Sequence, residues 1–339
     1  MSTKLRVAVF GAGAFGRNHA RVLSQMKDVE LTAVVDLDVE KAKRVAHEYG
    51  TVGITGFDEL PGEIAAAIVA TPTVTHETVA EGLLGSGVDV LVEKPIADSV
   101  EAGGRLTRLA EENGLILQVG HLERFNPAVA KLSDLVTVPL FFEVHRLSLF
   151  TPRSLDVDVV LDLMIHDLDI VLQLTGEMPS EVRAAGISVL SSKVDIANVR
   201  LAFASGCVAN LTASRVSTEQ VRKLRLFQPG EYLTVDYQRQ DLTRLRILPN
   251  ELKRPIENKG VGEGGFVFPI GAERISTEKA EPLALELASF VRAVRQRSRP
   301  KVDGTEAIRA LQLAGTILAT IEEHASVVNE TIQRSAQLK

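Results

Sequence analysis

Short apolar runs alternate with amphipathic stretches through the first 120 residues of the chain. The apolar runs are predicted to be buried strands over residues 6–10, 30–35, 65–70, 88–93 and 115–119. The amphipathic stretches are predicted to be helices over residues 17–26, 39–49, 76–84 and 99–113. Strands and helices that alternate at this spacing predict an α/β domain with a doubly wound parallel sheet.

The pattern changes after Gly120. One helix is predicted over residues 157–174, and short alternating runs between residues 181 and 247 predict an antiparallel or mixed sheet. The glycine-rich stretch Pro255 to Gly271 is predicted to be a loop, and two helices are predicted over residues 282–297 and 305–323. We therefore expect a first domain over residues 1–120 and an α+β domain over residues 121–339, whose C-terminal helices could pack back on the first domain.

A glycine-rich turn lies between the first predicted strand and the first predicted helix. In Gly11-x-Gly13-x-x-Gly16 the first glycine makes the turn, the second admits a pyrophosphate, and the third allows close helix packing. Asp36 ends the second strand, where it would accept hydrogen bonds from ribose hydroxyls and repel a 2′-phosphate. A turn that binds no ligand is the alternative, but this context predicts a Rossmann domain that binds NAD. The residues of this predicted cofactor site are Gly11, Gly13, Ala14, Phe15, Gly16 and Asp36.

Polar residues follow two further strands, at the edge of the sheet where ligands of α/β proteins bind. Glu93-Lys94-Pro95 comes directly after a buried strand, where desolvated charges are costly unless they have a function. The proline could adopt the cis form and so orient Lys94. Solvated charges at an ordinary strand exit are the alternative. Thr71, Pro72 and His76 follow the preceding strand and, with Glu93, are further candidates for cofactor contact.

Asp162 and His166 lie four residues apart in the predicted helix of the second domain. That spacing places both side chains on one helix face, where the carboxylate would fix the imidazole tautomer and raise its basicity. The pair is therefore a candidate proton acceptor. An ion pair on the helix surface is the alternative, since Asp167 and Asp169 are also available.

The segment from His121 to Pro127 follows the last strand of the first domain. Arginine and asparagine side chains suit the recognition of phosphates or sugar hydroxyls. We expect His121, Arg124, Asn126 and Arg153 to contact the substrate, with Arg146 as a weaker candidate. A polar linker between the domains is the alternative.

The composition limits the class of protein. The net charge of −6 argues against nucleic-acid binding, and no apolar stretch approaches the ~20 residues that span a bilayer. The single cysteine, Cys207, excludes an internal disulfide and fits a reducing compartment. The first residues carry no signal-peptide pattern. We expect a cytoplasmic protein with a small-molecule substrate, no membrane partner and no metal site.

In their order along the chain, the glycine-rich turn, the stretch Ala70 to His76, Glu93-Lys94-Pro95 and Asp162-x-x-x-His166 resemble the Gfo/Idh/MocA family of oxidoreductases. The resemblance spans essentially the whole chain. It implies a Rossmann domain followed by an α+β domain with a large, mostly antiparallel sheet that often makes oligomer contacts. It also implies dehydrogenation of sugars, inositols or related polyols with NAD(P), by a homodimer or homotetramer.

Within this family, residues 121–127, 156–169 and 227–232 are similar to the branch that oxidises UDP-N-acetylglucosamine at C3. In that branch the 3-keto sugar passes to an aminotransferase, which supplies diamino sugars for lipid A-type glycolipids. An inositol or free-sugar dehydrogenase, an NAD-dependent glycosidase and a non-catalytic NAD sensor are the alternatives.

The resemblance implies that Lys94, Asp162 and His166 are catalytic. Lys94 or His166 could take the proton, and the sequence does not decide between them. One departure from many relatives is Val159-Val160-Leu161, which stands in place of a Gly-Gly pair and changes the packing next to the site.

Overall fold

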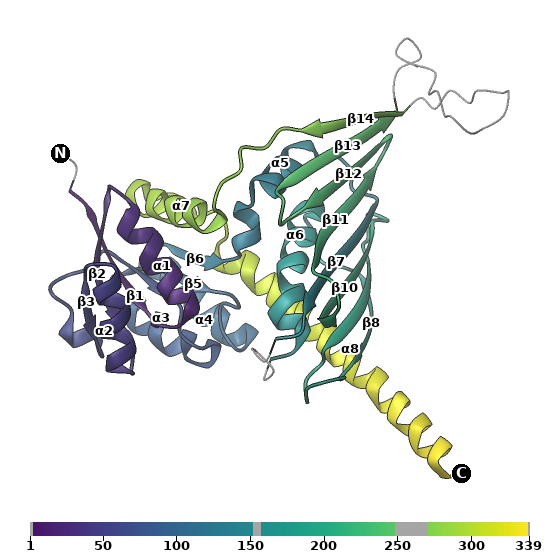
Figure 1. The fold of residues 1–339 in the computed structure, drawn as a ribbon, viewed down its shortest axis with the longest axis horizontal. Coiled ribbons are helices and arrows are strands. Elements are labelled where there is room, and N and C mark those ends of the chain that lie inside the picture. The colour runs from purple at the N-terminus through teal and green to yellow at the C-terminus, as the bar shows by residue number, and fades with distance from the viewer. Residues whose placement is uncertain (1–2, 152–156, 248–269, 338–339) are drawn as a thin grey trace. The chain divides into compact units, whose positions relative to one another are not determined.

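The computed structural model describes residues 3–151, 157–247 and 270–337, with side chains as far as residue 326. The chain forms two compact units (Figure 1). The first comprises Met1–Phe125 and Ala280–Leu313, and the second comprises Asn126–Lys279 and Ala314–Lys339. The domain boundary expected at residue 120 stays a prediction.

The described strands of the first unit form one parallel sheet in the order β3-β2-β1-β4-β5-β6. This order confirms the predicted Rossmann-type α/β fold. Its strands are β1 (Leu5–Phe10), β2 (Val29–Val35), β3 (Val52–Ile54), β4 (Ala66–Val69), β5 (Asp89–Glu93) and β6 (Leu117–Gly120).

Helices cover this sheet because its central strands are apolar on both faces. All four residues of β4 are buried, which requires cover on each side. Helix α7 comes from the later part of the chain and packs in one apolar core with α1 and the sheet, through Leu287, Phe290 and Val291. The helices of this unit are α1 (Ala14–Gln25), α2 (Val39–Glu48), α3 (His76–Gly85), α4 (Val100–Glu112), α7 (Pro282–Gln296) and the beginning of α8 (Gly304–Gln337).

The described strands of the second unit form one large sheet in the order β14-β13-β12-β11-β7-β10-β9-β8 (Figure 1). Only the β7–β10 pair of these strands is parallel, which confirms a mostly antiparallel sheet. The strands are β7 (Phe141–Leu149), β8 (Glu181–Ile187), β9 (Ile196–Ala202), β10 (Val208–Ser217), β11 (Val221–Gln228), β12 (Glu231–Asp236), β13 (Asp241–Ile247) and β14 (Ile270–Ile275).

Helices pack against this second sheet at several places. Helix α5 (Pro127–Leu135) contacts β12 and β13, and a π-helical turn (Val160–Met164) that precedes α6 (Ile165–Thr175) contacts β10. The side chain of Ile321 on α8 lies against Gly186 of β8. Helix α8 is 34 residues long, yet neither it nor any other helix in the described part of the chain is long and apolar enough to cross a membrane.

The structure differs from the sequence-based prediction in several elements. Strands β3, β7 and β14 and helix α5 were not predicted, and α8 continues to Gln337 rather than ending near residue 323. The predicted loop Pro255 to Gly271 lies outside the described residues except for its last two, which belong to β14. The helix predicted over residues 157–174 contains the π-helical turn, and Gly176 ends it at a φ of +74°.

We predict that Phe290→Ala lowers the free energy of unfolding by about 3–5 kcal/mol, because it leaves a large cavity beneath α7. Urea denaturation followed by circular dichroism measures this change. Phe57→Ala is the matched control, since the Phe57 ring is 40% exposed and its removal should cost much less. Equal losses in the two variants would contradict the packing of α7 in this core.

Candidate active site

The glycine-rich turn owes two of its glycines to close backbone packing. Gly11 has a φ of +102°, and a Cβ there would lie 2.4 Å from the carbonyl oxygen of Ala70. A Cβ on Gly16 would lie 1.8 Å from the carbonyl oxygen of Gly11. No described atom lies within 4 Å of a Cβ built on the exposed Gly13, which caps α1. Gly13 therefore leaves the helix N-terminus open to a phosphate, the arrangement that a dinucleotide requires.

Asp36 lies at the end of β2, beside this turn. Its carboxylate accepts hydrogen bonds from the backbone N–H of Ala12 at 2.7 Å and of Asp38 at 2.9 Å. Asp36 also lines a cavity of about 440 Å³, within the ~300–1,000 Å³ range of small-molecule pockets. Leu37, Phe57, Thr71 and Val79 are among the other lining residues. These residues fit an NAD molecule. Gly13 and the exposed Ala14 and Phe15 would flank its pyrophosphate, and Asp36 would bind its ribose.

His76 connects two of the loops that follow the strands. Its Nδ1 lies 2.9 Å from the carbonyl oxygen of Pro95, and its Nε2 lies 2.9 Å from that of Thr71. Burial lowers the pKa of the imidazole, although both carbonyls favour its charged form. Thr71 also accepts a hydrogen bond from Thr75 at 2.9 Å. The ring of His76 thus lies between the two loops, and in its neutral form it donates to one of the two carbonyls, while Pro72 is exposed next to it.

Glu93 and Lys94 are supported by a residue that sequence reasoning missed. His19 on α1 is fully buried, and its Nε2 donates to Oε1 of Glu93 at 2.7 Å. Burial alone would raise the pKa of Glu93, but the hydrogen bond and charge of His19 and the charge of Lys94 hold it below the ordinary value. The Lys94–Pro95 peptide bond is cis. A polar residue on the apolar face of α1, three positions after Gly16, was the signal that could have identified His19.

Glu286 on α7 is a second buried acid that the sequence did not point out. Its side chain is fully buried, and neither carboxylate oxygen has a hydrogen-bond partner among the described residues. Burial, reinforced by the negative charge of Glu93, raises its pKa well above the ordinary value. Glu286 is therefore a neutral carboxylic acid at a pH where Glu93 is ionised.

Asp162 and His166 belong to the second unit and lie on an irregular helical segment. The N–H of Ile165 donates to the carbonyl oxygen of Val160, the wider spacing that defines a π-helical turn. Asp162 lies within this turn and His166 in the first turn of α6, and both are partly buried. Such turns occur frequently at functional sites.

The neighbouring acid Asp167 is paired with an arginine. Asp167 is buried and accepts two hydrogen bonds from Arg146, at 2.7 Å and 2.9 Å. The guanidinium of Arg146 also lies 5.0 Å from the ring centroid of Tyr237. Arg146 and Asp167 therefore form an internal ion pair, and the weaker substrate role expected of Arg146 stays a prediction.

The predicted substrate residues lie in different surroundings. His121 is buried, as is Arg124, which pairs with Glu306 at 3.2 Å. Asn126 caps α5 by accepting from Ala128 at 3.1 Å and donates to the carbonyl oxygen of Tyr237 at 2.9 Å. Arg153 lies outside the described residues. Their contact with substrate stays a prediction.

A dinucleotide turn on a parallel sheet, followed by a mostly antiparallel sheet, defines a two-part NAD-binding oxidoreductase. The chain matches the model of the oxidoreductase family with an NAD-binding Rossmann fold over residues 5–121. It matches the GFO/IDH/MocA C-terminal domain over residues 140–228. The chain belongs to the GFO/IDH/MocA family of oxidoreductases, and its cofactor is NAD.

Individual relatives agree with this assignment. UDP-N-acetylglucosamine 3-dehydrogenase of Acidithiobacillus ferrooxidans is 35% identical over 94% of this chain and 97% of that protein. A solved structure of that enzyme superposes with a TM-score of 0.85 at 34% identity, covering 95% of this chain and 99% of the other. Inositol 2-dehydrogenase of Rhizobium meliloti is 26% identical over 94% of this chain and 97% of that protein.

We predict that Asp36→Ser weakens NADH binding about tenfold, or ~1.4 kcal/mol, and narrows the preference over NADPH, because the variant lacks the carboxylate that binds the ribose and repels a 2′-phosphate. Titration of the nucleotide fluorescence measures both affinities. Asp58→Ser removes the same charge from an exposed position and should change neither. An unchanged ratio of affinities in Asp36→Ser would contradict the assigned role.

We predict that Glu286→Gln stabilises the protein increasingly as the pH rises above about 4.3, the pKa of an unperturbed glutamate. The folded-state pKa of Glu286 is raised, so the wild type loses stability as the unfolded chain ionises and the folded one does not. Thermal midpoints between pH 5 and 8 test this. Glu63→Gln at an exposed position is the control, and parallel pH curves for wild type and Glu286→Gln would refute the prediction.

Proposed function

We propose that the protein oxidises the C3 hydroxyl of UDP-N-acetylglucosamine to a ketone, with NAD as the oxidant. The observation that carries this proposal is the 35% identity to a UDP-N-acetylglucosamine 3-dehydrogenase, which extends over nearly the whole length of both chains. Gly13, Asp36 and Lys94 lie at the edge of the Rossmann sheet where such a reaction would be expected.

The proposed chemistry uses three side chains. NAD, when bound, accepts a hydride from the carbon that carries the reacting hydroxyl. Lys94 stabilises the negative charge that develops on the oxygen, or accepts the proton itself. His166 takes the hydroxyl proton in the first of these two schemes, and Asp162 orients its ring.

Recognition of the nucleotide sugar is assigned to polar residues in the part of the chain that follows β6. A diphosphate favours charge-assisted hydrogen bonds from arginine, and sugar hydroxyls favour amide and imidazole groups. We assign these contacts to His121, Arg124, Asn126 and Arg153.

An inositol or free-sugar dehydrogenase is the second candidate function, because inositol 2-dehydrogenases are among the relatives that cover most of the chain. The two functions differ in whether turnover depends on the uridine diphosphate group. A panel of nucleotide sugars and polyols with NAD, read at the NADH absorbance, separates them. An aminotransferase that consumes the ketone should be included, because oxidation of a sugar alcohol by NAD is uphill at neutral pH.

The chain offers a surface for the homodimer or homotetramer that we propose. Phe227, Tyr232 and Leu245 are cross-strand neighbours on β11, β12 and β13, and they line an apolar depression on the sheet. Their alternation with the buried Leu226 and Leu233 places them on the opposite face. We further propose a cytoplasmic role in which the 3-keto product is aminated for lipid A-type glycolipids.

We predict that Lys94→Met and His166→Asn each slow hydride transfer by roughly 10²–10⁴-fold, the range typical of lost acid–base assistance. Pre-steady-state formation of NADH with UDP-N-acetylglucosamine measures this step. Lys43→Met and His47→Asn make the same changes at exposed positions and should react at the wild-type rate. Near-normal hydride transfer in both site variants would overturn the assignment.

A further inference from the structure

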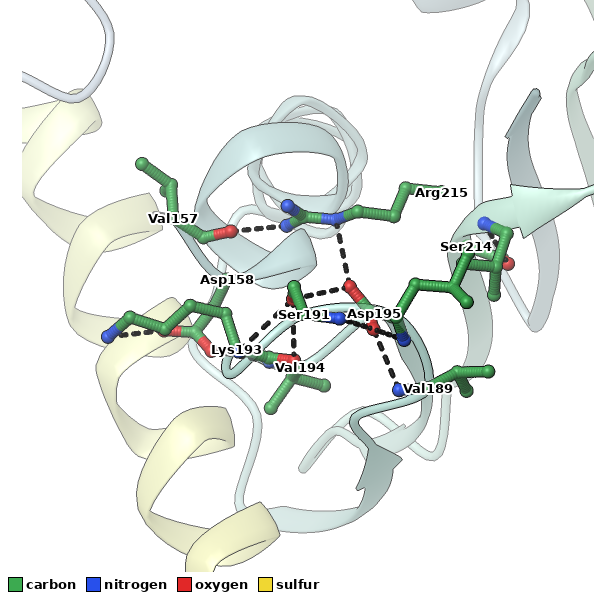
Figure 2. Close-up of polar contacts among 11 residues, drawn as sticks. Val157, Asp158, Val189, Ser191, Lys193, Val194, Asp195, Ser214 and Arg215 are labelled. Atoms are coloured by element: carbon green, nitrogen blue, oxygen red, sulfur yellow. Dashed lines mark hydrogen bonds and ion pairs between the residues drawn. The ribbon is translucent and has the colours of Figure 1, made fainter. Parts of the chain in front are cut away.

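The segment that carries Asp162 begins at a dense set of polar contacts within the second unit. Asp158 and Val159 precede the π-helical turn and contact the connection between β8 and β9, and Figure 2 shows Asp158 beside Lys193 and Val194 of that connection. The N–H of Val194 donates to Oδ1 of Asp158 at 2.8 Å. The N–H of Val159 donates to the carbonyl oxygen of Val194 at 2.9 Å. Two hydrogen bonds thus join the start of the helical segment to this connection.

Asp195 is the last residue of this connection and accepts hydrogen bonds from several residues before it. Its side chain is fully buried, and Oδ2 accepts from the backbone N–H groups of Val189, Leu190 and Ser191 at 2.7, 2.7 and 2.9 Å. Oδ1 accepts from the hydroxyl of Ser191 at 2.7 Å. Burial would raise the pKa of Asp195, but these hydrogen bonds lower it to about 2. The Asp195 carboxylate is therefore charged, and it holds residues 189–191 of the connection in place.

Arg215 on β10 carries this arrangement to the helical segment. Its Nε lies 3.7 Å from Oδ1 of Asp195, and its Nη2 donates to the carbonyl oxygen of Val157 (Figure 2). The N–H of Arg215 also donates to the carbonyl oxygen of Asp195 at 3.0 Å. The buried side chain of Arg215 thus joins Asp195 to Val157, the residue before Asp158.

Backbone hydrogen bonds connect Asp158 to Asp162. The carbonyl oxygen of Asp158 accepts from the N–H groups of Leu161 and Asp162, each at 3.0 Å. A change in the position of Asp158 is therefore transmitted directly to Asp162. Buried ion pairs add little stability over apolar side chains of similar volume, so stability alone does not account for the contacts among Asp195, Arg215 and Asp158. A role in fixing the position of the Asp162 side chain accounts for these contacts better.

We propose that Asp195, acting through Arg215 and Asp158, is a positioning residue for the Asp162–His166 pair. The proposal rests on the proposed function, because it assumes that this pair acts on the substrate. Asp195 need not touch the substrate. Misplacement of a reacting group by about 1 Å can cost on the order of 10²-fold in rate, and that is the effect a loosened segment should have.

The test compares Asp195→Asn with Asp241→Asn. Asp241 bonds Arg274 at 2.7 Å on β13 and β14 of the same unit, so its substitution is the matched control. We expect Asp195→Asn to lower kcat about 10²-fold with UDP-N-acetylglucosamine and to leave the Kd for NADH unchanged. Asp158→Ala should behave likewise, whereas Asp158→Asn keeps the acceptor for Val194 and should retain activity.

A second readout separates this proposal from the proposed function. The ring resonances of His166, identified by their loss in His166→Asn, should move in Asp195→Asn and Asp158→Ala and stay in place in Asp241→Asn. A wild type that does not oxidise UDP-N-acetylglucosamine contradicts the proposed function, while the resonances still decide the positioning role. If Asp195→Asn does not fold, Asp158→Ala decides. Unchanged kcat and unchanged His166 resonances, or a fall in kcat equal to the loss of folded protein, overturn the proposal.

Discussion

A hydrogen bond of 2.7 Å between His19 and Glu93 joins helix α1 to the end of strand β5. The N-terminus of α1 is the phosphate-binding end of the Rossmann fold, and Lys94 follows Glu93 directly, so this buried contact links the helix of the glycine-rich turn to the residue before Lys94. The contact also keeps Glu93 ionised despite burial. Glu286 shows the opposite case, because a buried acid without a partner among the described residues gives up its charge. The two glutamates differ because the carboxylate of Glu93 has a hydrogen-bond donor, His19, and that of Glu286 has none among the described residues.

The second unit also contains buried ion pairs. The sheet buries apolar side chains such as Leu224 and Leu226, whereas ionic groups gather beside the segment that carries Asp162 and His166. One ion pair joins Arg146 and Asp167 and the other joins Arg215 and Asp195. Each pair costs desolvation energy that only good geometry and additional hydrogen bonds recover. Such groups have defined positions, which is what we expect of a segment proposed to carry catalytic side chains, and apolar packing fixes side chains less strictly.

Much of the first unit could be predicted because its signals are local. An apolar strand followed by a glycine turn is encoded by neighbouring residues, and the glycine turn and the Rossmann order both appear in the structure. Helix α5 was missed although Asn126-Pro127 is a typical helix start, because its polar residues were interpreted as substrate contacts. The π-helical turn was missed because five apolar-rich residues have no periodicity that separates it from an α-helix. The contact of Asp195 with Arg215 depends on how two strands pair, which no local pattern specifies.

The electrostatics of Glu93 bear on the division of labour between Lys94 and His166. Coulombic attraction is mutual, so the charge of Lys94 that favours ionised Glu93 is itself stabilised by that carboxylate. An ammonium group beside a carboxylate can also stabilise negative charge that develops on a nearby oxygen. His166, which lies four residues after Asp162, is the proposed proton acceptor in the scheme in which Lys94 stabilises the oxygen. In the chemistry that we propose, the surroundings of Glu93 therefore favour the scheme in which Lys94 stabilises the developing charge and His166 takes the proton.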